Sequence, residues 1–294
     1  METITDLLAR ISELQAKSKA REQESARASA VTVQLPLWPD SVRAVPNGFL
    51  RSALFGVIRR GRRRFVKGEQ LAALDGIEIH YTGERLDQGD LDVYESVIHV
   101  ARFQGLGSRC RVTSYALLKL MGKSDTGKNR SMLQTRIERL RASAIRMKQG
   151  RYTFIGGLID EAYRDDETQE WVIVLNPRLR ALYEADQFTH VQWAVRQALD
   201  GHQLAQWLHG FYSSHARPYP IKIETLLKLA GSEDANPRSA KQTLCKALDA
   251  VSEACAAHGQ FFSYEIRDRV VYVEKTPSRS QRRHLAKAKR KHRG

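Results

Sequence analysis

The pattern of hydrophobic and polar positions predicts the same order of elements twice between residues 77 and 275. Apolar residues at helical spacing mark the helices, and short β-branched or aromatic runs between turn residues mark the strands. The first copy consists of a helix over 91–104 capped by Asp90, a strand over 109–112, a helix from Thr113 to Gly122, a basic helix over 129–148, and a hairpin of 152–155 with 171–175. The second copy consists of a helix over 191–214, a strand over 221–223, a helix over 224–231, a helix from Pro237 to Ala257 capped by Asn236, and a hairpin of 261–266 with 270–273.

Helix, strand, helix, helix, hairpin is the order of a winged helix domain. The sequence therefore predicts an α+β protein with two tandem winged helix domains. The expected segments are a flexible N-terminal arm over 1–45, a first domain over 46–186, a second domain over 187–275 and a basic tail over 276–294.

The third helix of each copy has one apolar face. Leu133, Ile137, Leu140 and Ala144 share one side of the first, and Leu244, Leu248, Val251 and Cys255 share one side of the second. In a winged helix domain the other side of this helix enters the major groove of DNA. A solvated face is the alternative for either helix alone, and the repeat of the whole pattern favours DNA binding.

The opposite faces carry the donors and acceptors that base edges and phosphates require. The candidate DNA-binding residues of the two helices and the second wing are Lys128, Arg130, Ser131, Gln134, Thr135, Arg238, Ser239, Gln242, Lys246, Arg267 and Arg269.

Composition agrees with a polyanionic partner. Lys and Arg outnumber Asp and Glu by 48 to 33, which gives a net charge of +15 over 294 residues. The tail from Thr276 onward carries eight Lys or Arg and no acid, and is too charged to fold by itself. Five arginines within 59–64 form a second basic patch, with phosphate contact and a solvated turn as equal alternatives.

The cellular compartment follows from three cysteines without a CxxC pair, from an N-terminus unlike a signal peptide, and from the lack of an apolar run long enough for a membrane helix. We expect a bacterial cytoplasmic protein without membrane contact.

Enzymatic interpretations are weaker. The segment 122–129 nearly matches a phosphate-binding loop, but Asn129 stands where a hydroxyl must ligate magnesium. The carboxylates around Asp165 crowd into a hairpin turn without a second cluster, and the histidines lack metal-ligand spacing. We therefore expect no enzyme activity, no cofactor and no metal.

The segment Gln34-Leu35-Pro36-Leu37-Trp38 is typical of a short peptide that another protein captures. Its prolines favour an extended backbone, Gln34 offers an amide, and Leu35, Leu37 and Trp38 offer three apolar anchors. This is the QLxLF pattern with which proteins bind the bacterial sliding clamp of DNA polymerase. The alternative is an edge strand or a linker that folds back on the core.

Two stretches, PNGFLRSALFGVIRRG and TSYALLKLMGKSDTGKNRS with the basic helix after it, carry a resemblance to a known family. The chain resembles the TrfA family, the replication initiators of broad-host-range IncP plasmids, from the QLPLW segment to the end of the second wing. The resemblance implies binding to direct repeats (iterons) in double-stranded origin DNA and opening of an AT-rich region, with its single strands as a further partner. It also implies recruitment of host DnaA, the replicative helicase and the sliding clamp, and a monomer and homodimer equilibrium. A tandem winged helix repressor of transcription is the alternative function.

Overall fold

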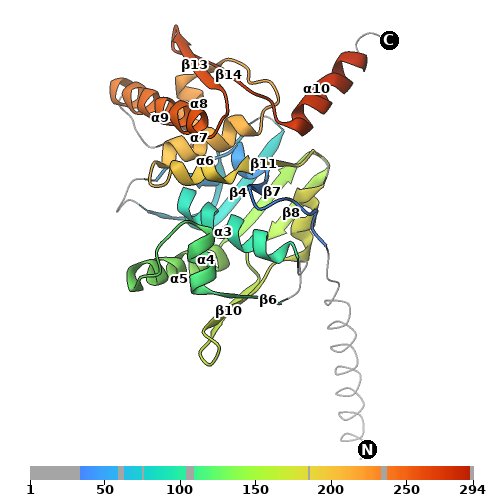
Figure 1. Cartoon of the computed structure of the whole chain (residues 1–294), viewed down its shortest axis with the longest axis vertical. Coiled ribbons are helices and arrows are strands. Elements are labelled where there is room, and N and C mark those ends of the chain that lie inside the picture. Colours follow the sequence, from blue (N-terminus) through green and yellow to red (C-terminus); the bar gives the residue numbers. More distant parts are fainter. Residues whose placement is uncertain are drawn as a thin grey trace, which may run out of the picture.

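The elements of the chain surround two hydrophobic cores. The computed structural model describes residues 34–58, 63–74, 76–103, 109–184, 186–232 and 237–291, without the side chains of 237, 238, 284 and 287–291. One core is built from residues between Leu35 and Val191, and the other from residues between Val195 and Val273. In Figure 1 the first unit occupies the lower half of the molecule and the second unit the upper half.

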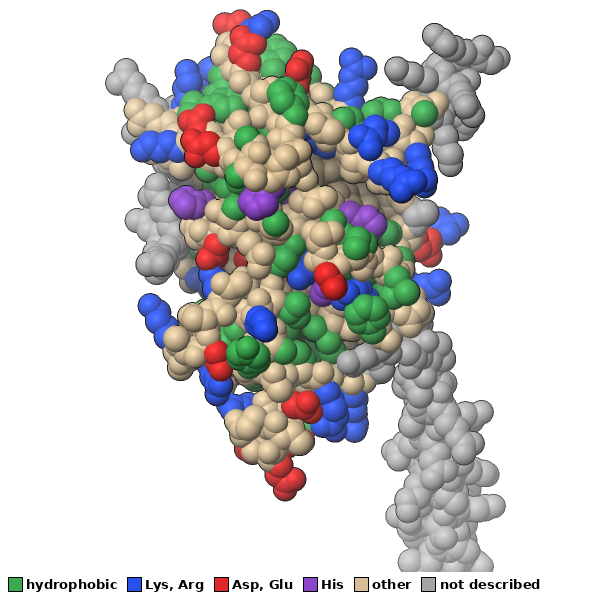
Figure 2. Space-filling view, viewed as in Figure 1, with side chains coloured by type: hydrophobic (Ala, Val, Ile, Leu, Met, Phe, Trp, Pro, Cys, Tyr) green, Lys and Arg blue, Asp and Glu red, His purple; other side chains and the backbone are tan. Residues whose placement is uncertain are grey.

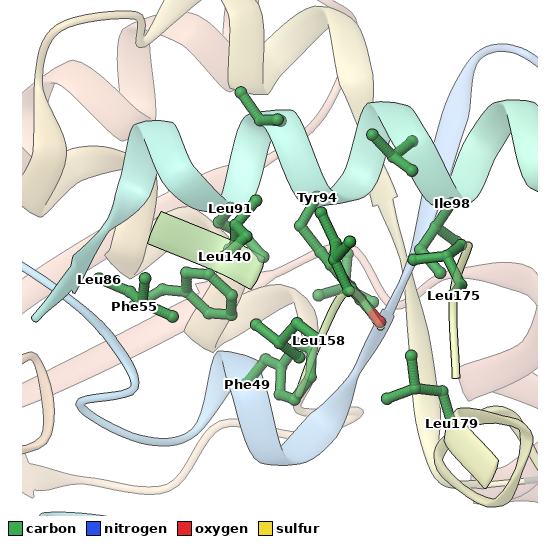
Figure 3. Close-up of a cluster of buried hydrophobic side chains, with 14 of the residues drawn as sticks. Phe49, Phe55, Leu86, Leu91, Tyr94, Ile98, Leu140, Leu158, Leu175 and Leu179 are labelled. Atoms are coloured by element: carbon green, nitrogen blue, oxygen red, sulfur yellow. The ribbon is translucent and has the colours of Figure 1, made fainter. Parts of the chain in front are cut away.

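The first unit is centred on one helix, α3, whose inner side meets Phe49, Phe55 and Leu158 in Figure 3. Its elements are β1 (Val42–Pro46), α2 (Asn47–Leu50), β2 (Phe55–Gly56), β3 (Phe65–Leu71), β4 (Ile77–Glu84), β5 (Leu86–Asp87), α3 (Gln88–Ala101), β6 (Arg109–Thr113), α4 (Ser114–Leu120), α5 (Gly127–Arg141), β7 (Ala144–Gln149), β8 (Tyr152–Gly156), β9 (Glu161–Asp165), β10 (Glu170–Val174), the 3-10 helix η1 (Pro177–Tyr183) and β11 (Phe188–Gln192).

The predicted order of helix, strand, helix, helix and hairpin is present in this unit as α3, β6, α4, α5 and β9–β10. Thr113 caps α4 as predicted, because its hydroxyl accepts from the Ala116 amide at 3.1 Å. The cap of α3 is Asp87 instead of Asp90. Asp90 is the third residue of the capping box, and its carboxylate accepts from the Asp87 amide at 2.9 Å.

Two predictions about the first copy are wrong. The basic helix ends at Arg141 instead of residue 148, and residues 152–155 pair with β7 instead of 171–175. Alternate side chains of β7 (Ile145, Met147, Gln149) are buried, so pairing with β4 and β8 overrides the helical spacing that Ala144 continues. Strand β10 pairs with β9 and β6, whereas β7 and β8 extend a separate sheet in the order β3-β4-β7-β8.

The second unit contains the predicted order of helix, strand, helix, helix and hairpin as α7, β12, α8, α9 and β13–β14, with α6 before it and α10 after it. Its elements are α6 (Trp193–Ala198), α7 (Gln203–Ser213), β12 (Ile221–Lys222), α8 (Ile223–Leu229), α9 (Pro237–Ala257), β13 (Phe262–Arg267), β14 (Val270–Lys275) and α10 (Arg279–Lys291). The single helix predicted over 191–214 is wrong, because Val191 lies in β11 and Gly201, at φ +81°, separates α6 from α7. The capping role predicted for Asn236 lies outside the described residues.

The two ends of the described chain are more ordered than predicted. Residues 34–45 of the expected flexible arm pack on the first unit, and β1 pairs with β11. The basic tail contains the helix α10 (Figure 1). A capping box starts this helix, in which Gln281 Oε1 accepts from the Ser278 amide at 3.0 Å and Ser278 Oγ accepts from the Gln281 amide at 3.3 Å. The first 33 residues of the predicted arm lie outside the described chain.

Candidate nucleic-acid interface

Helix α5 separates its buried and exposed residues as the sequence predicts. Thr126 caps it, and Leu133, Ile137 and Leu140 are buried on one side. The opposite side exposes all five predicted residues of this helix, which are Lys128, Arg130, Ser131, Gln134 and Thr135. Ala144, the fourth residue predicted for the apolar stripe, is an exposed residue of β7.

The exposed side chains of α5 bond mainly to neighbours on the same segment. Arg130 makes a bidentate pair with Asp125, at 2.6 and 2.7 Å, and Gln134 Nε2 donates to Glu138 Oε1 at 2.9 Å. The hydrogen bond from Arg130 lowers the pKa of Asp125 below its usual value. Such exposed pairs are weak, so these donors can exchange their partners for a base or a phosphate.

A buried ionic cluster holds α5 against the start of α3, and sequence reasoning missed it. Arg136 Nη1 lies 2.6 Å from Asp87 Oδ1 and 3.0 Å from Asp90 Oδ1, and Arg139 Nη1 lies 2.6 Å from Asp90 Oδ1. Arg63 contacts both carboxylates as well. Burial favours a raised pKa for Asp87, but Arg136 and Arg63 outweigh it and lower its pKa to about 2. No local sequence pattern marks this cluster, because its acids lie about fifty residues from the two arginines of α5 in the chain.

One glycine permits this cluster. A Cβ at Gly89, in the first turn of α3, would collide with the guanidinium of Arg136. The arginine therefore lies directly against the α3 backbone. Arg63 and Arg64 are the last two residues of the basic patch 59–64, whose first four residues lie outside the described chain. Arg64 pairs with Glu69 at 2.9 Å.

Helix α9 has the equivalent arrangement in the second unit. Leu244, Leu248, Val251 and Cys255 form its buried stripe, as predicted. Among the predicted contact residues, Gln242 and Lys246 are exposed and Ser239 is half-buried, while the side chain of Arg238 lies outside the described set. Burial raises the pKa of Cys255 to about 11, which agrees with its predicted role as a packed thiol.

The hairpins β9–β10 and β13–β14 differ in charge. Asp165 ends β9 and is followed by Asp166 and Glu167 in the turn, so the tip of the first hairpin would repel phosphate. Arg267 ends β13 and Arg269 lies in the turn before β14; both predicted residues are exposed and pair with Glu265 and Glu224 respectively. The second hairpin is therefore better suited to contact a DNA backbone.

The predicted clamp-binding segment folds back on the first unit in this structure. Leu35 and Trp38 are buried at 2% and 4% exposure, whereas Leu37 is 68% exposed. The Trp38 ring is stacked on Tyr183 with 6.4 Å between centroids. Gln34 Nε2 donates to the Arg102 carbonyl.

His99 and Asp40 extend this contact. The Trp38 indole N–H donates to His99 Nδ1 at 3.1 Å, and His99 Nε2 lies 3.0 Å from Asp40 Oδ1. Burial and the charges of Arg43 and Arg102 lower the pKa of His99 to about 4, so the ring is neutral at pH 7. A neutral ring can accept from Trp38 with one nitrogen and donate to Asp40 with the other.

The remaining chemical candidates have structural roles. In the segment that resembles a phosphate-binding loop, Asn129 Nδ2 donates to the Ser124 carbonyl at 2.8 Å and Thr126 caps α5. Within the described residues, no group of three or more His, Cys, Asp or Glu side chains could hold a metal ion. No helix in the same part of the chain is long and apolar enough to cross a membrane.

The sequence matches proteins of plasmid replication. The model of the family described as TrfA protein matches residues 3–271. The chain is 26% identical over 229 residues to the plasmid replication initiator protein TrfA of Escherichia coli, covering 74% of this chain and 57% of that protein. It is 28% identical over 167 residues to RepFIB replication protein A of Escherichia coli, covering 53% of this chain and 51% of that protein. The chain thus spans about half the length of the curated relatives that it matches.

Solved structures are similar in fold. Domains 2 and 3 of RctB superpose with a TM-score of 0.53 at 12% identity, covering 79% of this chain and 98% of that one. The Pi initiator protein in complex with iteron DNA gives a TM-score of 0.47 at 11% identity, and the match covers 64% of this chain and 91% of that one. The likeness to RctB supports the mixed architecture of helices and small sheets. Because the family match extends over nearly the whole sequence, the chain belongs to the TrfA protein family.

Proposed function

We propose that this chain is a plasmid replication initiator that binds direct repeats in double-stranded DNA. The observation that carries the proposal is the pair of helices α5 and α9, each with a buried stripe and an exposed polar and basic face. Both helices reach the left edge of the molecule in Figure 1, and Lys and Arg side chains project from that edge in Figure 2. One DNA duplex along this edge could therefore contact both.

In this proposal both units are winged helix domains, and α5 and α9 occupy successive major grooves of one repeat. Gln134 of α5 and Gln242 of α9 contact base edges, because both are exposed on the side opposite the buried stripe. Lys128, Lys246 and the arginines of the second wing contact phosphates. The net charge of +15 supports the electrostatic part of this binding.

Separate Ala substitutions of Gln134 and Gln242 test base readout. Each should cost about 1 to 3 kcal/mol of binding free energy on a duplex with the plasmid's own direct repeat, and little on a random duplex, because each removes a bond to a base and none to a phosphate. Gln70→Ala, an exposed glutamine of β3, is the matched control. The measurement is fluorescence anisotropy at fixed salt. Equal effects on both duplexes would mean that the two glutamines do not read sequence.

The segment Gln34–Trp38 supports sliding clamp binding as a second part of the proposal. Leu37 is exposed and available, while Leu35 and Trp38 must leave the first unit before a clamp groove can take them. A short peptide of this segment should therefore bind more tightly than the whole chain, because its binding includes no release from the core.

Leu37→Ala is the clean test of clamp binding. If Leu37 becomes fully buried in an apolar groove, its truncation should weaken binding by about 1.5 to 3 kcal/mol, or at least tenfold in Kd. Ile155→Ala, which truncates another exposed side chain at 66% exposure, is the control. The measurement is binding of each purified variant to an immobilised clamp. If Leu37→Ala binds as tightly as the parent chain, the segment is only a structural part of the first unit.

Opening of AT-rich DNA and recruitment of host DnaA and the replicative helicase complete the proposed role. A transcriptional repressor would also bind repeats, so DNA binding alone does not distinguish the two functions. An origin plasmid that depends on this chain for replication does distinguish them. A repressor would leave such a plasmid unable to replicate.

A further inference from the structure

Arg196 of the second unit forms hydrogen bonds with helix α3 of the first unit. It lies on α6 of the second unit and is 1% exposed. Its Nε donates to Asp92 Oδ1 at 2.6 Å, its Nη1 to Gln88 Oε1 at 3.1 Å and its Nη2 to the Gln88 carbonyl at 3.0 Å. Both partners lie in the first two turns of α3, in the first unit. The guanidinium therefore fixes α6 to the start of α3 in both distance and angle.

The same turns of α3 hold the DNA-facing helix of the first unit. Asp87 and Asp90 bind Arg136 and Arg139 of α5, as described above. The acceptors for α5 and those for Arg196 thus alternate within residues 87–92. A shift of α3 relative to α6 would move α5 with it.

The helix that carries Arg196, α6, also packs against α9, the DNA-facing helix of the second unit. Val195 and Leu199, on either side of it, belong to the same hydrophobic core as Leu244 and Leu248 of α9. A continuous connection therefore runs from α9 through α6 and Arg196 to α3, and from α3 to α5. Other bonds cross between the units, among them Trp193 Nε1 to the Leu120 carbonyl at 2.8 Å. Gln206 Nε2 of α7 also donates to Asp92 Oδ2, at 3.4 Å, so it shares this carboxylate with Arg196.

The buried charges around Arg196 also favour a fixed contact between α6 and α3. Asp92 is the main counter-ion of Arg196, since Glu95 Oε2 lies farther from its Nε, at 3.6 Å. Burial raises the pKa of Glu95 to about 7, so this carboxyl is partly protonated at neutral pH. A buried pair of this kind costs much to break, because each charge would remain without its partner away from water.

We infer that Arg196 is a positioning residue that sets the spacing of α5 and α9 and so selects DNA sites by the separation of their two halves. The inference rests on the proposed function, in which both helices read one repeat. Inserting one base pair between the halves moves one of them around the duplex by about a tenth of a turn. A rigid pair of helices then cannot reach the bases of one half, whereas a loosened pair can adapt.

Three duplexes test the inference: the plasmid's own repeat, the repeat with one base pair inserted between its halves, and a random sequence. For the parent chain we expect the insertion to raise Kd about a hundredfold, as the removal of two bonds to bases predicts. The measured quantity is the ratio of Kd on the repeat with the insertion to Kd on the unmodified repeat. For Arg196→Met this ratio should fall to about tenfold or less, and binding to the unmodified repeat should be weaker. Arg196→Lys keeps the charge but cannot make all three bonds, so its ratio should be intermediate.

Arg102→Met is the matched control, because Arg102 is also buried but its side chain contacts only residues of the first unit. It should keep the parent ratio. Thermal melting shows which variants are folded, and Arg196→Lys decides the question if Arg196→Met does not fold. A folded Arg196→Lys that keeps the parent ratio, or that weakens all three duplexes equally, overturns the inference. A parent chain that does not prefer its own repeat to the random duplex would overturn the proposed function instead.

Discussion

Replacing Trp38 by Ala should lower the free energy of unfolding by about 3 to 5 kcal/mol, the range for truncating a large aromatic side chain in a core. Trp38 is 4% exposed and stacked on Tyr183. Its removal leaves a cavity and also leaves His99 Nδ1 without its indole donor. Urea denaturation followed by circular dichroism measures the change.

Leu37→Ala is the control for this prediction. Because Leu37 is 68% exposed, its truncation should change the free energy of unfolding by no more than about 0.5 kcal/mol. If Trp38→Ala is as stable as Leu37→Ala, the segment does not rest on the first unit in solution. A variant that truncates both residues would combine weaker docking with lower stability, so it cannot test clamp binding.

The part of the second unit that follows β12 was predictable because its apolar spacing is regular. Leu244, Leu248, Val251 and Cys255 repeat at helical intervals without interruption, and all four are buried. Its hairpin was marked by short β-branched runs around Asp268 and Arg269, which take positive φ values of 49° and 65° in the turn. Local pattern and tertiary packing agree in this part of the chain.

The first unit was harder because pairing between distant strands decides its structure. Ala144 continues the helical spacing of Leu140, yet residues 144–149 pair with β4 and β8. Helical spacing alone cannot predict such a choice, since the partner strand lies more than sixty residues earlier in the chain. The strand β3 was missed because Lys67 to Gln70 interrupt its apolar positions. The strand β4 was missed although Ile77, Ile79 and Tyr81 alternate with polar residues, which is the pattern of a half-buried strand.

The exposed residues of the candidate interface could be predicted from the sequence, whereas the buried ionic contacts behind them could not. Gln134 and Lys128 followed from the position of the stripe opposite them. Arg136 and Arg139 lie on the same helix, but no local pattern shows that they face Asp87 and Asp90 instead of solvent. For Trp38 the sequence allowed both clamp binding and folding back on the core. It could not decide between them, because the partners Tyr183 and His99 are distant in sequence.

The C-terminal helix α10 leads to the prediction with the largest effect on DNA affinity. Its first turn is fixed to the second unit, since Gln281 donates to the Ser213 carbonyl at 2.7 Å and accepts from Lys275 Nζ at 2.9 Å. The rest of the helix projects away from the body in Figure 1, and Figure 2 shows Lys and Arg side chains where it begins. The helix thus directs a basic segment of the chain, with Arg282 and Arg283 exposed in its first half, away from the second unit.

Changing Lys287, Lys289, Arg290 and Lys291 together to Gln should weaken binding to repeat and random duplexes alike. Each phosphate that the variant no longer neutralises should reduce the slope of log K against log salt concentration by about 0.9. If all four residues contact phosphate, the parent chain should lose about a hundredfold more affinity than the variant between 50 and 200 mM salt. Gln281→Ala is the control, because it keeps every charge but removes the anchor, and it should shift affinity without the full change in slope. An unchanged slope in the fourfold variant would mean that these four residues do not contact phosphate.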